Sequence, residues 1–561
     1  MVRPAPTYRA AATLVLLLVA VPLVWSLEQA LLAGCDGAAW AALWADPQTG
    51  HALALSLWTG LASTTLATAI AAWILAGCSM GQKLQRLLGR QSWMLALPHA
   101  AFAMGLALLV APSGWLLRLL SPWATGLQSP PDWPTTQDPW GIGLIAVLVL
   151  KETPFLLWAA GAYLLRPDVA QRLQQELQVA ATLGYPARSA WWRIVWPQLL
   201  ARLTAPLLAV LAYGLCVVDV ALVIGPASPP TLAALAWQWL QDADVQTNAQ
   251  GAAAAWMLVA TLVALAGAAA ALVRLPLWRR RRTRGAPSFG RFRSVRAWHT
   301  SQRVTGDFWL RGIYVLVALA LLLASVSGVW PFPQLVPTQW SLSAWRAVAQ
   351  STNTLVTTVW LALASALAAL VWVVAWLELA PVRWQQRLQG LTLLALVLPA
   401  LLWVLGLHRL TLSWGLDATA WGLWLAHWLA CLPYVLLTLQ GPYNGFDNRL
   451  YQVAATLGHG RWTFLLRIKW PLLRASLASA GAVGFAVSVA QYLPTLYVGA
   501  GRFASVTTEA VALAAGGQRS LMAAYAALQC LLPAAAFALA VWLGRPRRFA
   551  PASQALGTIA P

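Results

Sequence analysis

Charged residues are scarce in this sequence. Asp, Glu, Lys and Arg make up 9% of the 561 residues, whereas hydrophobic types make up 60%. The mean hydropathy is +0.66. A soluble protein of this length needs far more polar surface to cover its core. The composition therefore excludes an ordinary soluble fold and indicates a polytopic membrane protein.

Lysine is almost absent, and this excludes one activity. A phosphate-binding loop of the nucleotide-hydrolysing type needs Gly-Lys followed by Ser or Thr. The only lysines are Lys83, Lys151 and Lys469, and none follows a glycine. The chain therefore cannot hydrolyse ATP itself. We predict no covalent chemistry, no catalytic residues and no cofactor.

Cysteine and histidine are too few and too scattered for a metal centre. The five cysteines contain no Cys-x-x-Cys pair, and only Cys35 falls clearly in a loop predicted to lie outside the cell. This pattern favours neither a disulfide framework nor a zinc site. His99, His408 and His427 lie in or near apolar runs, where satisfied polar side chains are commoner than ligands.

Long apolar runs, in contrast, fill the chain. About twelve stretches are long enough to cross a bilayer as helices of about 20 residues. They cover residues 11–27, 52–77, 93–111, 141–165, 203–224, 253–274, 308–329, 354–377, 389–408, 419–440, 474–496 and 521–543. The first run lacks a clear signal-peptide cleavage site, so we expect it to be retained. The predicted fold class is all-α, a polytopic membrane protein with about 12 transmembrane helices in two six-helix repeats.

Positive charges alternate along the chain. Of the 37 Lys and Arg residues, 31 fall in the termini and in every second loop, and the net charge is +21. Positively charged loops stay in the cytoplasm, so both termini are predicted to be cytoplasmic. We expect the charge to contact membrane lipid and expect no nucleic acid as a partner.

A basic segment lies at the middle of the chain. Residues 277–307 are rich in Arg, Ser and Gly and begin with the run from Trp278 to Arg284. They predict a cytoplasmic linker between a first half, residues 1–276, and a second half, residues 308–561. The linker is either solvated or in contact with anionic lipid or a partner subunit.

One seven-residue word occurs twice. Gln-Val-Ala-Ala-Thr-Leu-Gly spans 178–184 and again 452–458, and Ile and Pro follow each glycine at the same offsets. The shift from position 178 to position 452 is about half the chain, and each copy lies in an Arg-bearing polar loop, at 166–202 and at 441–474. Such self-similarity indicates duplication, with each half presenting one element to a paired soluble partner.

Each copy predicts a helix, a turn and a second helix. Leu177, Ala180, Ala181 and Gly184 fall on one side of a short helix, where small residues allow another surface to approach. Gly184 is placed to end that helix in the left-handed conformation. Pro197 suits the first turn of the next helix. The alternative is an ordinary amphipathic helix at the membrane interface.

With Ile and Pro at these offsets, the repeated word resembles the EAA loop of binding-protein-dependent ABC importer permeases. That loop follows the pattern Glu-Ala-Ala, three residues, Gly, nine residues, Ile-x-Leu-Pro, and forms a coupling helix that docks on the ATPase subunit. This chain departs from it in both copies, with Gln for Glu, Val for the first Ala and Trp for Leu. The loss of the acid removes one ion pair with the ATPase.

The resemblance extends over nearly the whole chain. The layout resembles fused permeases such as those for thiamine and ferric iron, and residues 97–103 and 491–499 resemble YnjC-type permeases. It implies that coupling to the ATPase rests on two matched sets of residues. They are Gln178, Ala180, Ala181, Gly184, Ile194 and Pro197, and Gln452, Ala454, Ala455, Gly458, Ile468 and Pro471.

Polar residues inside predicted spans are costly and mark candidates for a substrate path. Lys151, Glu152, Asp219 and Gln491 are the candidates. In the family that the chain resembles, the spans that carry them line the passage. The alternative is that they tie helices together.

The resemblance implies a permease subunit without enzyme activity of its own. It would move a small solute inward by alternating access in the bacterial inner membrane, with two copies of a cytoplasmic ABC ATPase and a periplasmic or extracellular solute-binding protein. An ion-gradient-driven secondary transporter and a membrane-embedded enzyme are the alternatives. Thiamine, a metal chelate, an inorganic anion and a polar organic solute all stay open as substrates.

Overall fold

The computed structural model describes residues 6–78, 81–274, 305–392, 399–447 and 449–545. Within these ranges the regular secondary structure is helical, apart from one isolated β-bridge between Ser327 and Trp340. The predicted all-α fold class is confirmed. Most of the basic linker, including the run from Trp278 to Arg284, lies outside the described residues.

The helices of the first half are α1 (Pro6–Ala33), α2 (Gly37–Ala45), α3 (Thr49–Ala76), α4 (Gln82–Ala96), α5 (His99–Val110), α6 (Trp115–Leu120), α7 (Ile142–Leu164), α8 (Pro167–Thr182), α9 (Ala187–Ala190), the π-helical turn η1 (Trp191–Val195), α10 (Trp196–Arg202), α11 (Thr204–Cys216), α12 (Asp219–Ile224), α13 (Leu232–Leu240) and α14 (Val245–Arg274).

Those of the second half are α16 (Thr305–Ser325), α17 (Ser343–Gln350), α18 (Thr352–Leu379), α19 (Val382–Arg387), α20 (Gln389–Thr392), α22 (Ala400–Ser413), α23 (Ala420–Asn444), α24 (Arg449–Thr456), α25 (Arg461–Phe464), the π-helical turn η3 (Leu465–Lys469), α26 (Trp470–Leu472), α27 (Arg474–Ala490), α28 (Leu493–Val498), α29 (Val506–Ala515) and α30 (Arg519–Gly544).

The number of spanning helices is close to the predicted twelve. Among the described residues, nine helices are long and apolar enough to cross a membrane, and two bent pairs raise the number to eleven. The run expected at 389–408 differs most, because the helix there, α22, has 14 residues and begins only after Pro399. Residues 393–398 of that run lie outside the described part of the chain.

The internal repeat extends from the polar loop to the last span. α12 starts at Asp219 and α28 starts at Leu493, which is the same shift as between the two copies of the seven-residue word. The ends of these two helices, the starts of α13 and α29, and the starts of α14 and α30 keep that shift. Before the loop the halves diverge, since the shift from α3 to α18 is larger. The duplicated word therefore belongs to a longer repeated unit.

The two halves exchange their first helices. α1 packs against α22 and α18 of the second half, while α16 packs against α5 of the first half and against α30. The Trp372 side chain of α18 donates a hydrogen bond to the Val15 carbonyl of α1 at 2.7 Å. Reciprocally, the Tyr314 hydroxyl of α16 donates to the Leu150 carbonyl of α7 at 3.1 Å.

A buried glycine at corresponding positions allows each exchanged helix to approach. A Cβ at Gly105 of α5 would stand 2.6 Å from Cγ1 of Val317 on α16. A Cβ at Gly406 of α22 would overlap the carbonyl oxygen of Ser26 on α1. Small residues at a membrane helix interface let backbones come into direct contact. The exchange thus depends on the same residue type in both halves.

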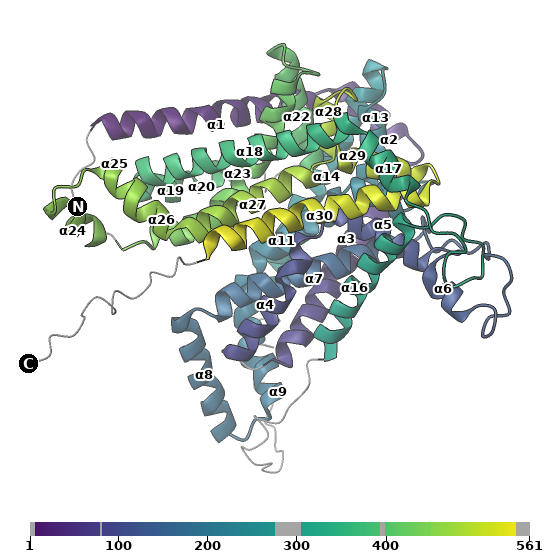
Figure 1. The fold of residues 1–561 in the computed structure, drawn as a ribbon, viewed down its shortest axis with the longest axis horizontal. Helices are drawn as coiled ribbons and strands as arrows, with labels where there is room; N and C mark the ends of the chain where they lie inside the picture. The colour runs from purple at the N-terminus through teal and green to yellow at the C-terminus, as the bar shows by residue number, and fades with distance from the viewer. Residues whose placement is uncertain (1–5, 79–80, 275–304, 393–398, 448, 546–561) are drawn as a thin grey trace, which may run out of the picture.

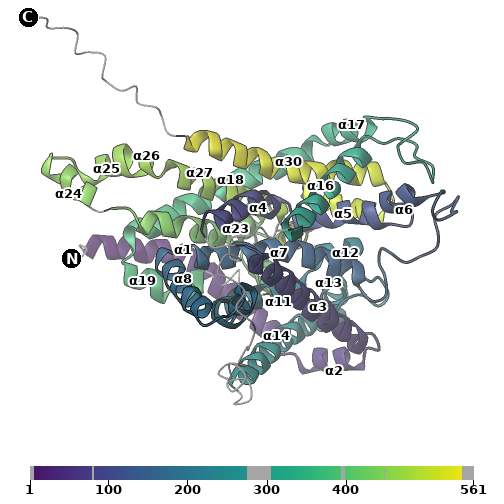
Figure 2. The same ribbon diagram turned by 90° about the horizontal axis from the view of Figure 1, so that it is seen from below.

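The repeated polar loops lie at one end of the molecule. Figure 1 shows α8 and α9 at the bottom and α24 to α26 at the far left, whereas α2, α6 and α17 lie at the right. Figure 2 gives the same separation from a second direction. α1 begins and α30 ends toward the loops (Figure 1). The helices that carry the two loops diverge, so the loops stand apart from each other.

Candidate functional site: two elbows and a polar membrane interior

Each repeated loop folds into an elbow, a name we use for α8 to α10 in the first half and for α24 to α26 in the second. The helix that follows each elbow is sharply bent away from it, by 64° in the first half and 75° in the second. In the first elbow, α9 with η1, from Ala187 to Val195, forms the predicted second helix.

The turn inside each elbow has the predicted left-handed glycine. φ is +82° at Gly184 and +79° at Gly458. In the first elbow the Gly184 and Tyr185 amides donate to the carbonyls of Ala181 and Ala180, at 3.1 and 3.0 Å. The second elbow repeats both bonds at the matching positions, at 3.0 Å each. This is the Schellman arrangement, which satisfies the last carbonyls of a helix.

A π-helical turn precedes the proline in both elbows. η1 starts at Trp191 and η3 at Leu465, so the two turns keep the shift of the repeated word. The Trp196 amide reaches back to the carbonyl of Trp191, and the Trp470 amide reaches back to that of Leu465. The proline that follows directly in each elbow has no amide hydrogen to continue the α-helical ladder. The wider π-helical turn therefore allows the helix to continue through the proline.

The predicted coupling residues fall into three groups by their exposure to solvent. Ala180 and Ala454 are buried; Ala181, Gly184, Ile194, Pro197 and Ile468 are half-buried; Gln178, Gln452, Ala455, Gly458 and Pro471 are exposed. Within the repeated word, the valine and the leucine stay exposed in both copies. Val179 is 59% and Leu183 69% exposed, and Val453 and Leu457 are 57% and 70% exposed.

The sequence comparison with the loop pattern did not mark these four residues. Val and Leu four positions apart lie on the same face of a helix. Each elbow therefore presents one pair of exposed apolar side chains at its tip, Val179 with Leu183 and Val453 with Leu457. The identity of both pairs in the two copies was the signal that sequence reasoning could have used.

The elbows are braced differently. In the first, the Gln198 amide donates to Glu176 at 2.6 Å, and Arg172 lies 3.7 Å from the same carboxylate. In the second, Glu378 at the end of α18 accepts from Arg461 and Lys469, both at 2.7 Å, and from the Tyr443 hydroxyl at 2.8 Å. The second elbow is thus held to a spanning helix by charged groups.

The start of the first elbow carries one further ion pair. Arg166 donates to Asp168 at 2.9 Å, and both side chains are mostly exposed. This hydrogen bond holds the pKa of Asp168 below its usual range. An ionised acid in the first turn of α8 also suits the positive end of the helix dipole.

Lys151 is used to connect helices. Its side chain is buried, and its ammonium group donates to the carbonyls of Met94 and Leu97 at 3.0 and 2.6 Å. The rings of Phe102 and Tyr314 lie 5.9 and 5.6 Å from the same nitrogen. These contacts tie α7 to the end of α4 and direct the ammonium group to backbone carbonyls.

Glu152 and Asp219 both interact with one histidine. His99 Nε2 is 3.3 Å from Oε1 of Glu152, and His99 also interacts electrostatically with Asp219. The His99 ring lies 4.7 Å from that of Tyr213. Asp219 and Tyr213 are half-buried, whereas the Glu152 side chain is 9% exposed. Sequence spacing does not group these residues, because they come from α5, α7, α11 and α12.

Gln491 lies at the break between α27 and α28. Gln491 is half-buried. Its backbone amide donates to the Ser488 carbonyl, and its backbone carbonyl accepts from the Thr495 hydroxyl. Beside it, the buried His427 ring pairs with the hydroxyls of Ser488 and Thr495 at 2.8 and 2.9 Å. His427 is thus a satisfied core histidine, as its apolar surroundings predicted.

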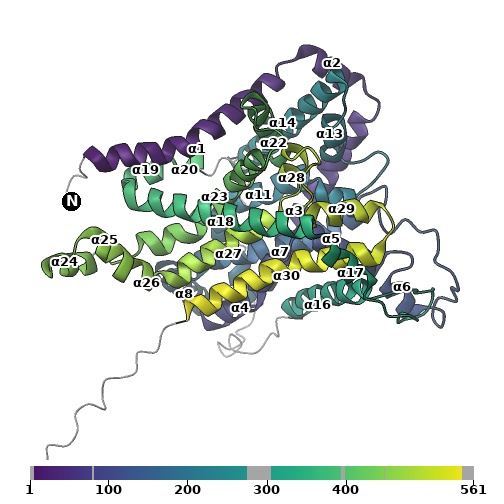
Figure 3. The ribbon, with the colours of Figure 1, turned by 45° about the horizontal axis from the view of Figure 1, so that its top comes forward.

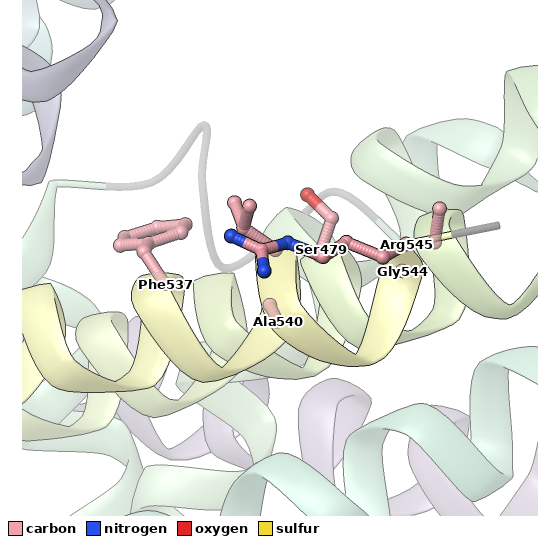
Figure 4. A pocket seen from close by; sticks show the side chains of 7 residues that line it. Ser479, Phe537, Ala540, Gly544 and Arg545 are labelled. Atoms are coloured by element: carbon pink, nitrogen blue, oxygen red, sulfur yellow. The ribbon is translucent and has the colours of Figure 1, made fainter. Parts of the chain in front are cut away.

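A hollow on the outside of the bundle is separate from these residues. Figure 4 shows it beside α30, with Phe537, Ser479 and Arg545 among its labelled side chains. Its other lining residues are Ala475, Ala540, Val541 and Gly544. It contains none of the four candidate path residues.

The chain is similar to a known permease over nearly its whole length. No family model matches the chain. It is 36% identical to the inner membrane ABC transporter permease protein YnjC of Escherichia coli over 521 residues, which cover 91% of this chain and 92% of that protein.

A partial likeness links it to a second kind of permease. The chain is 30% identical over 116 residues to the spermidine/putrescine transport system permease protein PotC of Haemophilus influenzae, covering 45% of that protein, and 27% identical over 109 residues to PotC of Escherichia coli. A permease subunit is not the catalytic part of its transporter, since a separate ATPase hydrolyses ATP. With nearly full-length likeness and a multi-pass helical fold, this chain belongs to the ABC transporter permeases of the inner membrane.

Proposed function

We propose that the chain is the permease of an ATP-driven importer, which accepts a small solute from an external binding protein and moves it into the cytoplasm. Two copies of a cytoplasmic ATPase subunit would dock on the two elbows. The observation that supports this best is the identical exposed apolar pair at the tip of each elbow, in two copies of the same local fold.

The chemistry of the tips suits a docking surface. Each pair stays 57% to 70% exposed, at the turn of a loop that also buries an alanine of the same word. Burial of one leucine contributes about 1.5–3 kcal/mol, and such anchors commonly dominate binding between proteins. Matched pairs on two elbows suit two copies of one ATPase subunit.

The arrangement of the elbows supports alternating access. They stand at the ends of diverging helices (Figure 1). If the two ATPase subunits closed together, they would pull the two elbows toward each other. The two halves of the permease would then rotate relative to each other. The two bends at the start of α11 and α27 would transmit that movement to the membrane interior.

Docking can be tested with charge at the tips. Leu183→Asp with Leu457→Asp should leave the permease inserted but lower the yield of copurified ATPase at least tenfold. The matched control is Leu342→Asp, which alters a leucine of 57% exposure beside α17, at the opposite end of the molecule. Unchanged copurification in the double variant would favour an interfacial helix that docks nothing.

The energy source needs its own experiment. Uptake into proteoliposomes should require the ATPase subunit, ATP and the binding protein, and should survive a protonophore. Uptake by the purified chain alone, driven by an ion gradient, would instead establish the secondary transporter. Gln178→Ala should weaken docking far less than Leu183→Asp, because a neutral exposed amide contributes about 1 kcal/mol or less.

A further inference from the structure

The hollow of Figure 4 lies between α27 and α30, at the end of the molecule that carries the elbows. Figure 1 and Figure 3 show these two helices side by side, with α30 ending toward the second elbow. A Cβ added to Gly544 of α30 would stand 3.0 Å from Cβ of Ala475 on α27, and both residues line the hollow. The two helices are therefore in direct contact beside it.

The size and lining of the hollow suit a hydrocarbon chain. α1 and α30 are the least buried spanning helices in the described ranges, and Val541 of α30 is 66% exposed where it lines the hollow. Phe537 and Ala540 add further apolar surface. The volume is about 260 Å³. Sites for small solutes usually measure about 300–1,000 Å³. A small apolar hollow on a face that lipid covers therefore fits part of an acyl chain.

Two arginines meet at the elbow end of the hollow. Arg545 lines it, and Figure 4 shows its side chain turned back along α30. Arg474, the first residue of α27, donates a hydrogen bond to the Arg545 carbonyl. In the described part of the chain, neither arginine forms a salt bridge. Charged groups at a membrane surface usually pair or extend toward water, so this site is suited to an anion.

A third polar group faces the same space. Ser479 of α27 lines the hollow, and its hydroxyl makes no hydrogen bond within the described ranges. Serines inside helices commonly donate to the carbonyl one turn earlier, as Ser26 does to Pro22. The Ser479 hydroxyl is therefore available to a polar group of a ligand, between the apolar lining and the arginines.

We propose that this hollow binds an anionic phospholipid from the leaflet on the side of the elbows, which the charge pattern predicts to be cytoplasmic. One acyl chain lies against Phe537 and Val541, and the phosphate accepts hydrogen bonds from Arg474 and Arg545. Guanidinium groups bind phosphate through charge-assisted, often paired hydrogen bonds. Basic pockets between spanning helices on the cytoplasmic side suit acidic headgroups. This site does not depend on the direction or the energy source of transport.

The internal repeat does not account for the two arginines. At the shift of the repeat, the positions that correspond to Arg474 and Arg545 hold Leu200 and Ala271. The proposed site therefore belongs to the second half alone. Arg474 also begins α27 directly after the bend of 75°. A bound headgroup would thus connect the bend of the second elbow to the end of α30.

The experiment measures lipid binding to the purified full-length chain in detergent by native mass spectrometry. The probes are dioleoyl phosphatidylglycerol, dioleoyl phosphatidylcholine with the same chains, and glycerol 3-phosphate as a headgroup without chains. Phosphatidylglycerol should bind at least fivefold more tightly than phosphatidylcholine, and glycerol 3-phosphate should not bind. Equal binding of the two lipids, or equally tight binding of glycerol 3-phosphate, would overturn the proposal.

Variants locate the site. Arg474→Gln combined with Arg545→Gln should weaken phosphatidylglycerol binding at least tenfold. Ser479→Leu should also weaken it, because the larger side chain occupies the hollow without changing the charge. The matched control is Arg383→Gln, which removes an exposed arginine of α19 at the same end of the molecule (Figure 1). Unchanged binding in the double arginine variant, or an equal loss in the control, would refute the site. The unfolding temperature of each lipid-free variant shows that its fold is intact.

Discussion

At the scale of single residues, the left-handed glycine of each elbow gives a clean test. Gly458 and Gly460 lie two positions apart, and an added Cβ would meet nothing within 4 Å at either. They differ in backbone, since φ is +79° at Gly458 and −69° at Gly460. A left-handed residue with a Cβ costs about 1–2 kcal/mol.

Gly458→Ala should therefore weaken binding of the ATPase subunit by about fivefold or more, while Gly460→Ala should leave it unchanged. The measurement is the dissociation constant of the ATPase subunit with each variant in nanodiscs. Equal behaviour of the two variants would show that the elbow tolerates the strain and that its turn does not position the docking surface.

The glycines could be predicted from sequence because a repeated word that ends in Gly before a polar break is typical of a helix terminus. The exposure of Leu183 and Leu457 could not be predicted from sequence, because it depends on which face of the elbow packs against the span that follows. The pairing of His99 with Glu152 could not be predicted either, because residues so far apart in the sequence meet only through helix packing.

At the scale of helices, the brace on the second elbow predicts an asymmetry. Glu378 is 16% exposed in its side chain and accepts hydrogen bonds from Arg461, Lys469 and Tyr443. Hydrogen bonds to charged groups contribute about 1.5–3 kcal/mol, less where solvent screens them. Glu378→Gln should therefore loosen the second elbow, visible as faster proteolysis between Arg449 and Arg474.

The matched change in the first elbow is Glu176→Gln. Glu176 is 35% exposed, so its loss should have a smaller effect on proteolysis of residues 166–202. Faster cleavage of both elbows to the same extent would contradict the assignment of Glu378 as a local brace.

Helix boundaries show where apolar runs mislead. The predicted spans at 93–111 and 389–408 both contain a proline, and in each case a helix starts directly after it, α5 after Pro98 and α22 after Pro399. Proline disfavours the helical conformation of the residue before it. Leu97, the residue before Pro98, is extended, so the run at 93–111 is divided into α4 and α5. Hydropathy alone identifies the apolar run but does not show where the helix is interrupted.

At the scale of the whole molecule, the exchanged helices predict a stability effect in α22. Gly406→Ala would place a methyl group against the Ser26 carbonyl of α1, and overpacking of this kind costs about 1–3 kcal/mol. The unfolding temperature of the Gly406→Ala variant in detergent should therefore be lower than that of the unchanged protein. Gly312→Ala, in α16 with no atom within 4 Å of the added group, should leave it unchanged or raise it.

Orientation in the membrane follows from charge and is tested by reporter fusions. Fusions at Gly285 and after Arg548 should both report the cytoplasm, because Lys and Arg concentrate in the termini and in alternate loops. A fusion at Asp132 should report the opposite side. A periplasmic signal from either of the first two sites would remove the model of two six-span halves with cytoplasmic elbows.

The exchange of α1 and α16 has a consequence for synthesis on the ribosome. α1 ends at Ala33, whereas the helix on which it rests, α22, begins only at Ala400. The first span must therefore stay in the bilayer without α22 while most of the protein is synthesised. The packing of the first half is complete only after α16 has been inserted. Joining both halves in one chain keeps the late partner tethered, so the waiting helix is captured within its own polypeptide instead of by collision with another.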